Sequence, residues 1–214
     1  MRRKEFKVNE THEQDVISFL HEMSYGFLAT KNDNIYPGIL PINYVYFNGA
    51  IYFHGSRIGE KMKTIKQYPT VSFAVAKEYS QIPSYMNDPF YACPATVFFK
   101  SVIAYGKAVI VDDLKEKCDV LNALMQKLQP EGGYEPISLA DKGYAGQVKA
   151  TAIVRIEINR LNAKFKFGQN WKQEKLDNVG KQLSERGQQL DYETTQLMQR
   201  YCPHAQPNED LTQR

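Results

Sequence analysis

A two-residue turn signal, Asn48-Gly49, constrains the fold of this chain more than any other stretch. It joins residues 35–47 to residues 50–54, and both runs are rich in β-branched and aromatic side chains. Asn-Gly tolerates the positive φ angles of a type I′ turn, whose twist matches that of paired strands. The two runs are therefore predicted to form a β-hairpin. Because Pro37 and Pro41 have no backbone N–H to donate, we expect the first run at a sheet edge, a bulge or a gap in the pairing.

Four further segments have the apolar character or the alternation of β-strands. They are residues 25–30, 70–76, 97–111 and 148–158. The spacing of apolar residues predicts helices at residues 12–23, at residues 58–67 and after Asp112 or Asp113. Residues 79–95 are rich in proline and aromatic residues and are predicted to form a long loop.

The predicted strands follow one another as hairpins, and no strand–helix–strand series supports a parallel sheet. About six antiparallel strands favour a small barrel, since closure removes exposed sheet edges. We therefore expect a mainly β protein of the α+β class. After Leu161 the composition changes, and residues 172–202 are polar with sparse helical spacing. These features predict a barrel domain at residues 1–170 and a polar helical C-terminal extension at residues 171–214.

Composition argues against several classes of protein. Of 214 residues, 43% are hydrophobic and 12% aromatic, which is enough for a core and excludes a disordered chain. The net charge of +3 is well below that of a dedicated nucleic-acid-binding protein. No run approaches 18 uncharged apolar residues, so no membrane span is predicted. The three cysteines form no C-x-x-C pair and no disulfide framework, and we expect a cytoplasmic location.

Few of the motifs that mark catalytic or nucleotide sites occur in the sequence. Its histidines show no metal-ligand spacing, so no zinc or iron site is predicted; they are His12, His21, His54 and His204. Walker A and G-x-G-x-x-G loops are absent, which disfavours the common nucleotide-binding folds. A G-x-S-x-G elbow is also absent, although composition alone leaves a Ser/His/Asp or Cys/His site open.

The excess positive charge is concentrated in residues 57–66. Four basic side chains stand there against one acidic side chain, a net charge of +3 that equals that of the whole chain. Gly55 and Ser56 precede this segment, and Arg57 and Lys61 are predicted to lie on one side of the helix that follows. A helix N-terminus with two cations is suited to a phosphate monoester. Taken alone, the stretch is explained more simply as the solvated basic face of a surface helix.

Three other stretches have both a binding and a packing explanation. Pro41 interrupts the run at residues 40–43, either because a flat ligand lies against it or because the strand is at an edge. Residues 169–171 place two amides beside the only tryptophan, which suits stacking on a heteroaromatic ring and equally suits simple packing. Lys100 and Ser101 are explained most simply as outward-facing residues of a long strand.

In their order and spacing, five stretches of this sequence resemble the flavin-binding split-barrel family. They are YGFLAT at residues 25–30, P-x-x-x-P-x-NYV at 37–45, IYFHGS-x-x-G-x-K at 51–61, KSVI-x-x-G at 100–106 and the strand at 152–158. This family is the pyridoxamine-phosphate-oxidase-like superfamily, and the resemblance is to its nitroimidazole-resistance branch, over residues 1–170. It implies a six-stranded antiparallel split barrel with flanking helices, which forms a homodimer with FMN at the interface.

The resemblance also implies the residues of a flavin site. Those along the isoalloxazine ring would be Leu40, Pro41, Ile42 and Asn43, and those around the ribityl phosphate would be His54, Ser56, Arg57 and Lys61. Ser101 matches a polar position that contacts the flavin, and the partner chain would contribute Gln169, Asn170 and Trp171. The C-terminal tryptophan-and-arginine signature of true pyridoxamine-phosphate oxidases is absent, which argues against vitamin B6 synthesis.

The function that the resemblance implies is an FMN-dependent oxidoreductase. It would reduce nitroimidazoles or related nitroaromatic compounds with electrons from NAD(P)H, and His54 is the one side chain suited to an acid–base role. Two alternatives stay open at this point. One is a flavin-binding sensor, store or regulator without turnover, and the other is a split barrel that binds haem through a histidine.

Overall fold

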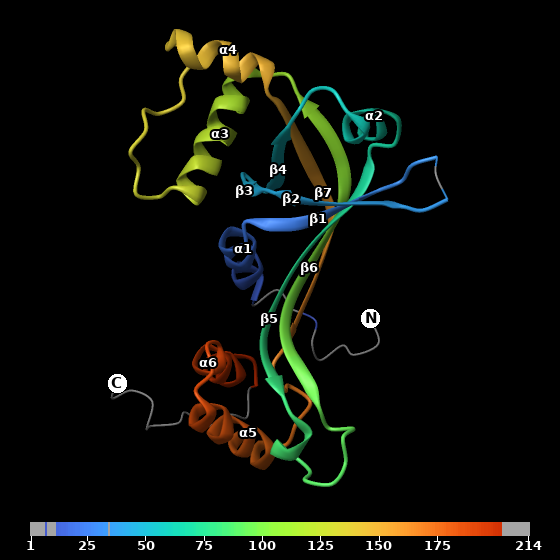
Figure 1. The fold of residues 1–214 in the computed structure, drawn as a ribbon, viewed down its shortest axis with the longest axis vertical. Coiled ribbons are helices and arrows are strands. Elements are labelled where there is room, and N and C mark those ends of the chain that lie inside the picture. Colours follow the sequence, from blue (N-terminus) through green and yellow to red (C-terminus); the bar gives the residue numbers. More distant parts are fainter. Residues whose placement is uncertain (1–6, 8–11, 34, 203–214) are drawn as a thin grey trace. The chain divides into compact units, whose positions relative to one another are not determined.

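The computed structural model describes residue 7, residues 12–33 and residues 35–202. Within the described residues, the chain packs as two compact units: a larger unit from residues 12–75 and 102–162, and a smaller unit from residues 7, 76–101 and 163–202. Three long strands contribute residues to both units (Figure 1); they are β5 (Thr70–Ile82), β6 (Thr96–Val111) and β7 (Ala152–Lys166).

The strands form a mainly antiparallel sheet of seven strands in the order β2-β1-β5-β6-β7-β4-β3. The four shorter strands are β1 (Tyr25–Thr30), β2 (Gly38–Asn43), β3 (Val45–Phe47) and β4 (Ala50–Gly55). The prediction of a mainly β protein with antiparallel pairing is confirmed. The predicted number of six strands is wrong, because the described residues contain seven.

The additional strand arises because the predicted run at residues 35–47 is divided. Its first part, β2, pairs with β1, whereas its last part, β3, pairs with β4. Between them Tyr44 is fully buried, its N–H donating to the Ser24 carbonyl (3.1 Å) and its hydroxyl to the Leu20 carbonyl (2.9 Å). These bonds fix the chain at Tyr44, directly after the last residue of β2 that pairs with β1. Beyond this point the chain pairs with β4 instead, and β2 and β3 lie at opposite ends of the strand order.

The hairpin predicted at Asn48-Gly49 is confirmed. Asn48 has a φ of 47° and Gly49 a φ of 79°, the positive values that a type I′ turn requires. Phe47 and Ala50 pair across this turn. The edge position predicted for Pro41 is also confirmed, since β2 is a terminal strand of the sheet.

The predicted loop at residues 79–95 is wrong at its start. β5 continues to Ile82 and is followed by a short 3₁₀ helix, η3 (Ser84–Met86), so that the irregular residues are Pro83 and residues 87–95. Tyr79, Ser80 and Ile82 are buried, and this burial keeps the strand going past the polar residues that precede it.

The predicted start of the last strand at residue 148 is also wrong. Residues up to Ala150 belong to helix α4 (Lys142–Ala150), and β7 begins at Ala152. The carboxylate of Asp141 caps this helix by accepting hydrogen bonds from the N–H groups of Gly143 (2.8 Å) and Tyr144 (3.0 Å).

The other predicted helices of the larger unit are α1 (Glu13–Glu22), α2 (Glu60–Gln67) and α3 (Leu114–Leu128). Of the two candidate caps for α3, the structure selects Asp113, whose carboxylate accepts from the Glu116 N–H (2.7 Å). The apolar face of α3 packs on β3 and β4 in a cluster that contains Val45, Ala50, Tyr52, Val111, Val120, Leu124 and Ile153. None of the helices in the described part of the chain is long and apolar enough to cross a membrane.

Helix α3 also supplies a lysine to each of two neighbouring helix ends. Lys127 donates to the Leu20 carbonyl (3.2 Å) and to the Met23 carbonyl at the end of α1, and burial lowers the pKa of Lys127 to about 8. Lys117, in the first turn of α3, donates to carbonyls at the end of α4. Cations are favoured at these positions because helix C-termini carry partial negative charge.

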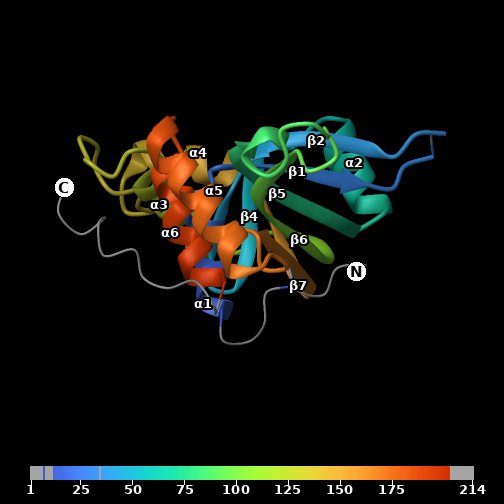
Figure 2. The ribbon, with the colours of Figure 1, turned by 90° about the horizontal axis from the view of Figure 1, so that it is seen from below.

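Residues 172–202 of the smaller unit contain two helices, α5 (Gln173–Arg186) and α6 (Asp191–Tyr201), which lie side by side (Figures 1 and 2). Gly187, in the left-handed conformation (φ 61°), ends α5. The two helices cover an aromatic core at the ends of the long strands, built from Phe98, Phe165, Phe167 and Tyr201. The predicted domain boundary between residues 170 and 171 stays a prediction.

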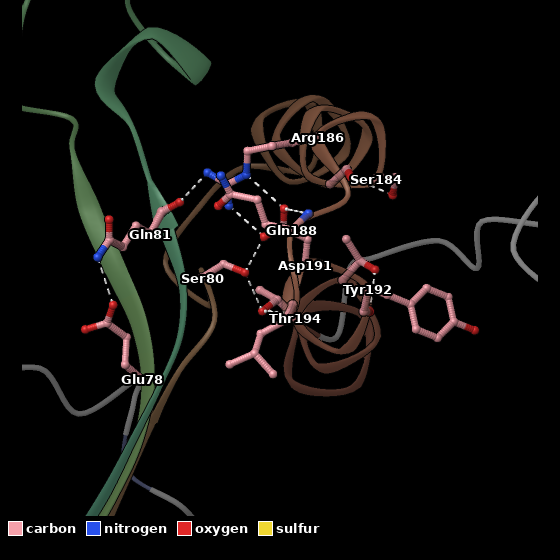
Figure 3. Close-up of polar contacts among 12 residues, drawn as sticks. Glu78, Ser80, Gln81, Ser184, Arg186, Gln188, Asp191, Tyr192 and Thr194 are labelled. Atoms are coloured by element: carbon pink, nitrogen blue, oxygen red, sulfur yellow. Dashed lines mark hydrogen bonds and ion pairs between the residues drawn. The ribbon is translucent and has the colours of Figure 1, made fainter.

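A buried carboxylate joins these helices to β5 (Figure 3). Asp191, 1% exposed, accepts from the Arg186 guanidinium (2.6 and 2.8 Å) and from the Ser80 hydroxyl (2.7 Å). It also accepts from the Gln188 N–H (2.9 Å), while Arg186 donates to the Gln81 carbonyl (2.9 Å). The buried carboxylate of Asp191 thus has a counter-ion in Arg186 and further hydrogen-bond donors in Ser80 and Gln188. These partners offset the cost of burying its charge.

Candidate functional site

The predicted phosphate-binding residues follow directly from the end of strand β4. Within the larger unit, β4 is buried through Phe53, and His54 is its first exposed side chain. The register of β4 with β7 places His54 opposite Ile153 and Gly55 opposite Ala152. The end of β4 therefore lies beside the junction between α4 and β7.

The segment after β4 differs from the predicted helix. Helix α2 begins at Glu60 rather than at residue 58, with Gly59 at its N-cap in a conformation (φ 139°, ψ 167°) that other residues rarely adopt. Arg57 therefore precedes the helix, and the prediction that Arg57 and Lys61 share one helix face is wrong. The Ser56 hydroxyl accepts from the Ile58 N–H (3.2 Å), so it forms a local turn and does not cap α2.

The side chain of Lys61 nevertheless lies near the end of β4. Its Nζ lies 3.0 Å from the position that a side chain Cβ would take on Gly55, and 5.2 Å from the centroid of the Phe53 ring. Burial lowers the pKa of Lys61. The pKa of His54 is lowered by burial and by the positive charge of Lys61. Because Gly55 has no side chain, the ammonium group can approach the backbone of the strand closely.

Arg57, which follows the end of β4, is held by α4. One guanidinium nitrogen, Nη1, donates to the Lys149 carbonyl (3.1 Å) in the last turn of that helix. Lys117 holds the same turn, donating to the Thr151 carbonyl (2.7 Å) and more weakly to the Val148 carbonyl (3.4 Å). The pKa of Lys117 is lowered by burial and by the charge of Arg57.

Lys117 is a residue of this region that the sequence did not identify. It is 3% exposed and lies on the buried face of α3 with Cys118, Val120 and Leu124. A lysine one position from an apolar stripe is a weak signal, since it is usually solvated at its tip. The only sequence indication is that Lys117 falls three residues before the buried Val120, at helical spacing.

The residues predicted to lie along the flavin ring belong to the edge strand β2. Leu40 is half-buried, Pro41 is exposed and Ile42 is buried. The exposed Asn43 donates to the Ser24 carbonyl (3.3 Å). An edge strand accommodates Pro41 without a ligand, so the ring contact stays a prediction.

The remaining predicted site residues belong to the smaller unit. The Ser101 hydroxyl donates to the Lys164 carbonyl (3.4 Å). The side chain of Gln169 is engaged in its own turn, donating to the Phe165 carbonyl (2.7 Å) and accepting from the Phe167 N–H (2.8 Å). The ring centroids of Trp171 and Phe98 are 5.3 Å apart, and the Lys175 Nζ lies 4.2 Å from the centroid of the Trp171 ring. Asn170 is exposed. Each contact within this chain matches the packing explanation, and a role toward a partner chain stays a prediction.

The described part of the chain contains no set of side chains arranged to bind a metal ion. Among these residues, no group of three or more His, Cys, Asp or Glu side chains is arranged to hold an ion. The polar side chains at the end of β4 are two cations, the Ser56 hydroxyl and the His54 imidazole, which are suited to an anion.

Residues 12–165 match the sequence profile of the family described as pyridoxamine 5′-phosphate oxidase. The chain belongs to this family. The profile spans the sheet from β1 to the last residues of β7 and includes His54, Arg57, Lys61 and Ser101. Residues 169–171 and both C-terminal helices lie outside it.

Solved structures with the same fold include proteins of different kinds. A candidate 5-nitroimidazole antibiotic resistance protein from Bacteroides thetaiotaomicron is 16% identical, with a TM-score of 0.60 over 74% of this chain and 85% of that chain. An FAD and haem binding protein from Mycobacterium smegmatis is 12% identical, with a TM-score of 0.62 over 76% and 74%. A flavocytochrome from Azotobacter vinelandii is 18% identical, with a TM-score of 0.60 over 75% and 73%. No curated protein matches the chain.

At these identities the resemblance shows a shared fold and does not by itself assign a ligand. Within the pyridoxamine 5′-phosphate oxidase family, the chemistry of this chain has to be argued from its own residues. The cations at the end of β4 are the feature that bears most directly on it.

Proposed function

We propose that this protein binds FMN and acts as a flavin-dependent oxidoreductase. The observation that carries the proposal is the approach of two cations to the end of β4. Lys61 reaches the backbone at Gly55, and Arg57 is held beside the strand that pairs with it. Membership of the pyridoxamine 5′-phosphate oxidase family supports the same reading.

The donor set at this strand end fits a phosphate monoester. Of the five N–H donors of an arginine, only one on Arg57 has a carbonyl partner in the described residues, so the guanidinium retains donors for an anion. The lowered pKa of Lys61 reflects the cost of burying an unneutralised ammonium, and a bound phosphate would offset that cost. The Ser56 hydroxyl adds a short polar side chain directly after the end of β4.

When bound, FMN supplies hydride and electron transfer between a donor and an acceptor. The residues of this chain would bind and orient it. Since His54 has its pKa lowered from an ordinary value near 6.5, it is neutral at pH 7. It would therefore orient a ligand through a hydrogen bond, while Arg57 and Lys61 carry the neutralising charge. Its role as an acid or base remains part of the proposal.

The substrate class we propose is small nitroaromatic compounds of the nitroimidazole type, reduced with electrons from NAD(P)H. The sequence motifs of residues 25–61 support this choice, as does the shared fold with the Bacteroides thetaiotaomicron protein. Such substrates are flat and could stack on a flavin ring.

A homodimer with the flavin at its interface belongs to the same proposal. In the paired strands β1 and β2, Tyr25, Phe27 and Ile39 are 45%, 47% and 67% exposed. Phe27 lies opposite Pro41 and Ala29 opposite Ile39, so these side chains occupy one face of the pair. A contiguous exposed apolar face of this kind commonly marks an interface. Substituting Phe27→Glu is expected to convert a dimer into monomers in analytical ultracentrifugation; a wild-type protein that is already monomeric would contradict the dimer.

The absorption spectrum of the purified protein tests the cofactor. We expect a flavin spectrum, release of the flavin by heating, and its identification as FMN by chromatography. Release of FAD would contradict the choice of FMN, and a Soret band without flavin would instead indicate the haem-binding alternative.

Anaerobic titration tests the reaction. NAD(P)H is expected to bleach the bound flavin, and a nitroimidazole is expected to restore its absorption. Bound flavin that no nicotinamide donor bleaches would exclude the reductase and leave the flavin-binding sensor, store or regulator as the explanation.

A further inference from the structure

The last turn of α4 is held by two cations that come from different parts of the chain. Arg57, which follows β4, donates to the Lys149 carbonyl (3.1 Å). Lys117, on α3, donates to the Thr151 carbonyl (2.7 Å) and the Val148 carbonyl (3.4 Å). In both views α3 and α4 lie next to each other (Figures 1 and 2). The C-terminal carbonyls of this helix therefore link the two cations.

Lys117 is buried where it contacts the last turn of α4. Its side chain is on the apolar face of α3, and the residue is 3% exposed. A buried ammonium group without partners is strongly unfavourable, so Lys117 requires carbonyls at this position. The alternative cap, a glycine after the helix, is absent, since Thr151 continues directly into the extended strand.

The last turn of α4 is linked to the candidate anion site in two ways, by the chain itself and by a hydrogen bond. Thr151 leads into Ala152, which pairs with Gly55 at the end of β4. Lys149 accepts the hydrogen bond from Arg57. In the described residues Arg57 makes no ion pair with a carboxylate, so this carbonyl is the contact that orients its guanidinium.

We propose that Lys117 is a positioning residue for the anion site. It fixes the last turn of α4, whose Lys149 carbonyl in turn holds the guanidinium of Arg57 beside the end of β4. The inference rests on the proposed function in one respect, namely that the anion is the phosphate of a flavin. A guanidinium held in place loses less conformational entropy when it binds a phosphate, so its orientation contributes to affinity.

The comparison of FMN with riboflavin isolates the phosphate, because riboflavin differs from FMN in lacking it. In Lys117→Met we expect the affinity of the flavin-free protein for FMN to fall about tenfold, the scale of one charge-assisted hydrogen bond. The affinity for riboflavin is expected to stay within about twofold of the wild-type value. Fluorescence titration measures both, and Lys117→Arg, which retains the cation, is expected to recover part of the FMN affinity.

Lys115→Met is the matched control. Lys115 lies on the same helix, its side chain is 84% exposed and it pairs with Asp119, so its loss removes the same charge without reaching α4. We expect its FMN-to-riboflavin affinity ratio to equal that of the wild type. In an Arg57→Ala background, Lys117→Met is expected to weaken FMN no further, because Lys117 acts through Arg57.

Several results would overturn the inference. They are an unchanged affinity ratio in Lys117→Met, an equal loss for FMN and riboflavin, or a full additional loss in the Arg57→Ala background. If Lys117→Met fails to fold, Lys117→Gln, which keeps one donor, is measured in the same way and is held to the same outcomes. A wild-type protein that binds FMN no better than riboflavin would instead contradict the phosphate site of the proposed function.

Discussion

Replacing Arg57 and Lys61 together with alanine is expected to abolish the retention of FMN during purification while leaving the fold intact. Each cation is expected to contribute about 1.5–3 kcal/mol to the binding of a phosphate, so their joint loss weakens FMN by roughly 100-fold or more. Neither side chain is among the buried residues of a core: Arg57 is exposed, and Lys61 is half-buried near Gly55 and Phe53 at the end of β4. Flavin occupancy, measured as the ratio of absorption near the flavin band to protein absorption, reports the effect.

The double substitution Lys63→Ala with Lys66→Ala is the matched control. Both lysines are exposed on α2, and their removal changes the net charge of the protein by the same amount. We expect this variant to retain FMN, because the charges lie on the solvated side of the helix. Full flavin occupancy in the Arg57 and Lys61 variant would show that the end of β4 does not hold the phosphate. Equal losses in both variants would show that only the overall charge matters.

Substituting Asp191→Ala is expected to destabilise the protein by about 3–5 kcal/mol, the usual result of removing one partner from a buried ion pair. The carboxylate is the common acceptor for Arg186, for Ser80 and for the backbone of Gln188 (Figure 3). Without it the Arg186 guanidinium, which is 17% exposed, loses its counter-ion. Chemical denaturation monitored by circular dichroism measures the free energy of unfolding.

Glu193→Gln, on the same helix, is the control for this prediction. Glu193 is half-exposed and pairs with Lys77 at 3.6 Å, so its loss is expected to cost less than about 1 kcal/mol. A stability of Asp191→Ala equal to that of Glu193→Gln would contradict the assigned role of the network.

The pH dependence of stability gives an independent check on Asp191. Burial raises its pKa, but hydrogen bonds from Arg186, Ser80 and Gln188 outweigh burial, and the net pKa lies below the ordinary value of 3.8. A carboxyl group with a depressed pKa in the folded state contributes stability above its unfolded pKa and loses it as the pH falls through its folded pKa. We therefore expect wild-type stability to fall below about pH 4 more steeply than that of Asp191→Ala.

The sequence predicted the elements that carry strong local signals. The Asn48-Gly49 turn specifies its hairpin through the φ angles of two residues, and Asp113 caps α3 through its own side chain. Strands β1, β4 and β6 agree with their predicted bounds to within one residue.

Helix α4 shows why other elements were missed. Gly143 and Gly146 lower its intrinsic helix propensity, and Val148 reads in sequence as the start of an alternating strand. The helix depends on the Asp141 cap and on the hydrogen bonds from Lys117, which lies more than 30 positions earlier in the chain. A contact of that separation has no local signature.

The sequence by itself determined the mainly β class, the hairpin of β3 and β4 and the cations after β4. These follow from turn chemistry, the period of the apolar residues and the identity of the side chains, all of which are local properties. Only the tertiary structure decided that Gly59 separates Arg57 from α2, that Tyr44 divides one predicted strand into two, and that the last turn of α4 lies between Arg57 and Lys117. Such arrangements depend on which distant backbone groups become buried and must find hydrogen-bond partners, and that is settled only when the chain has folded.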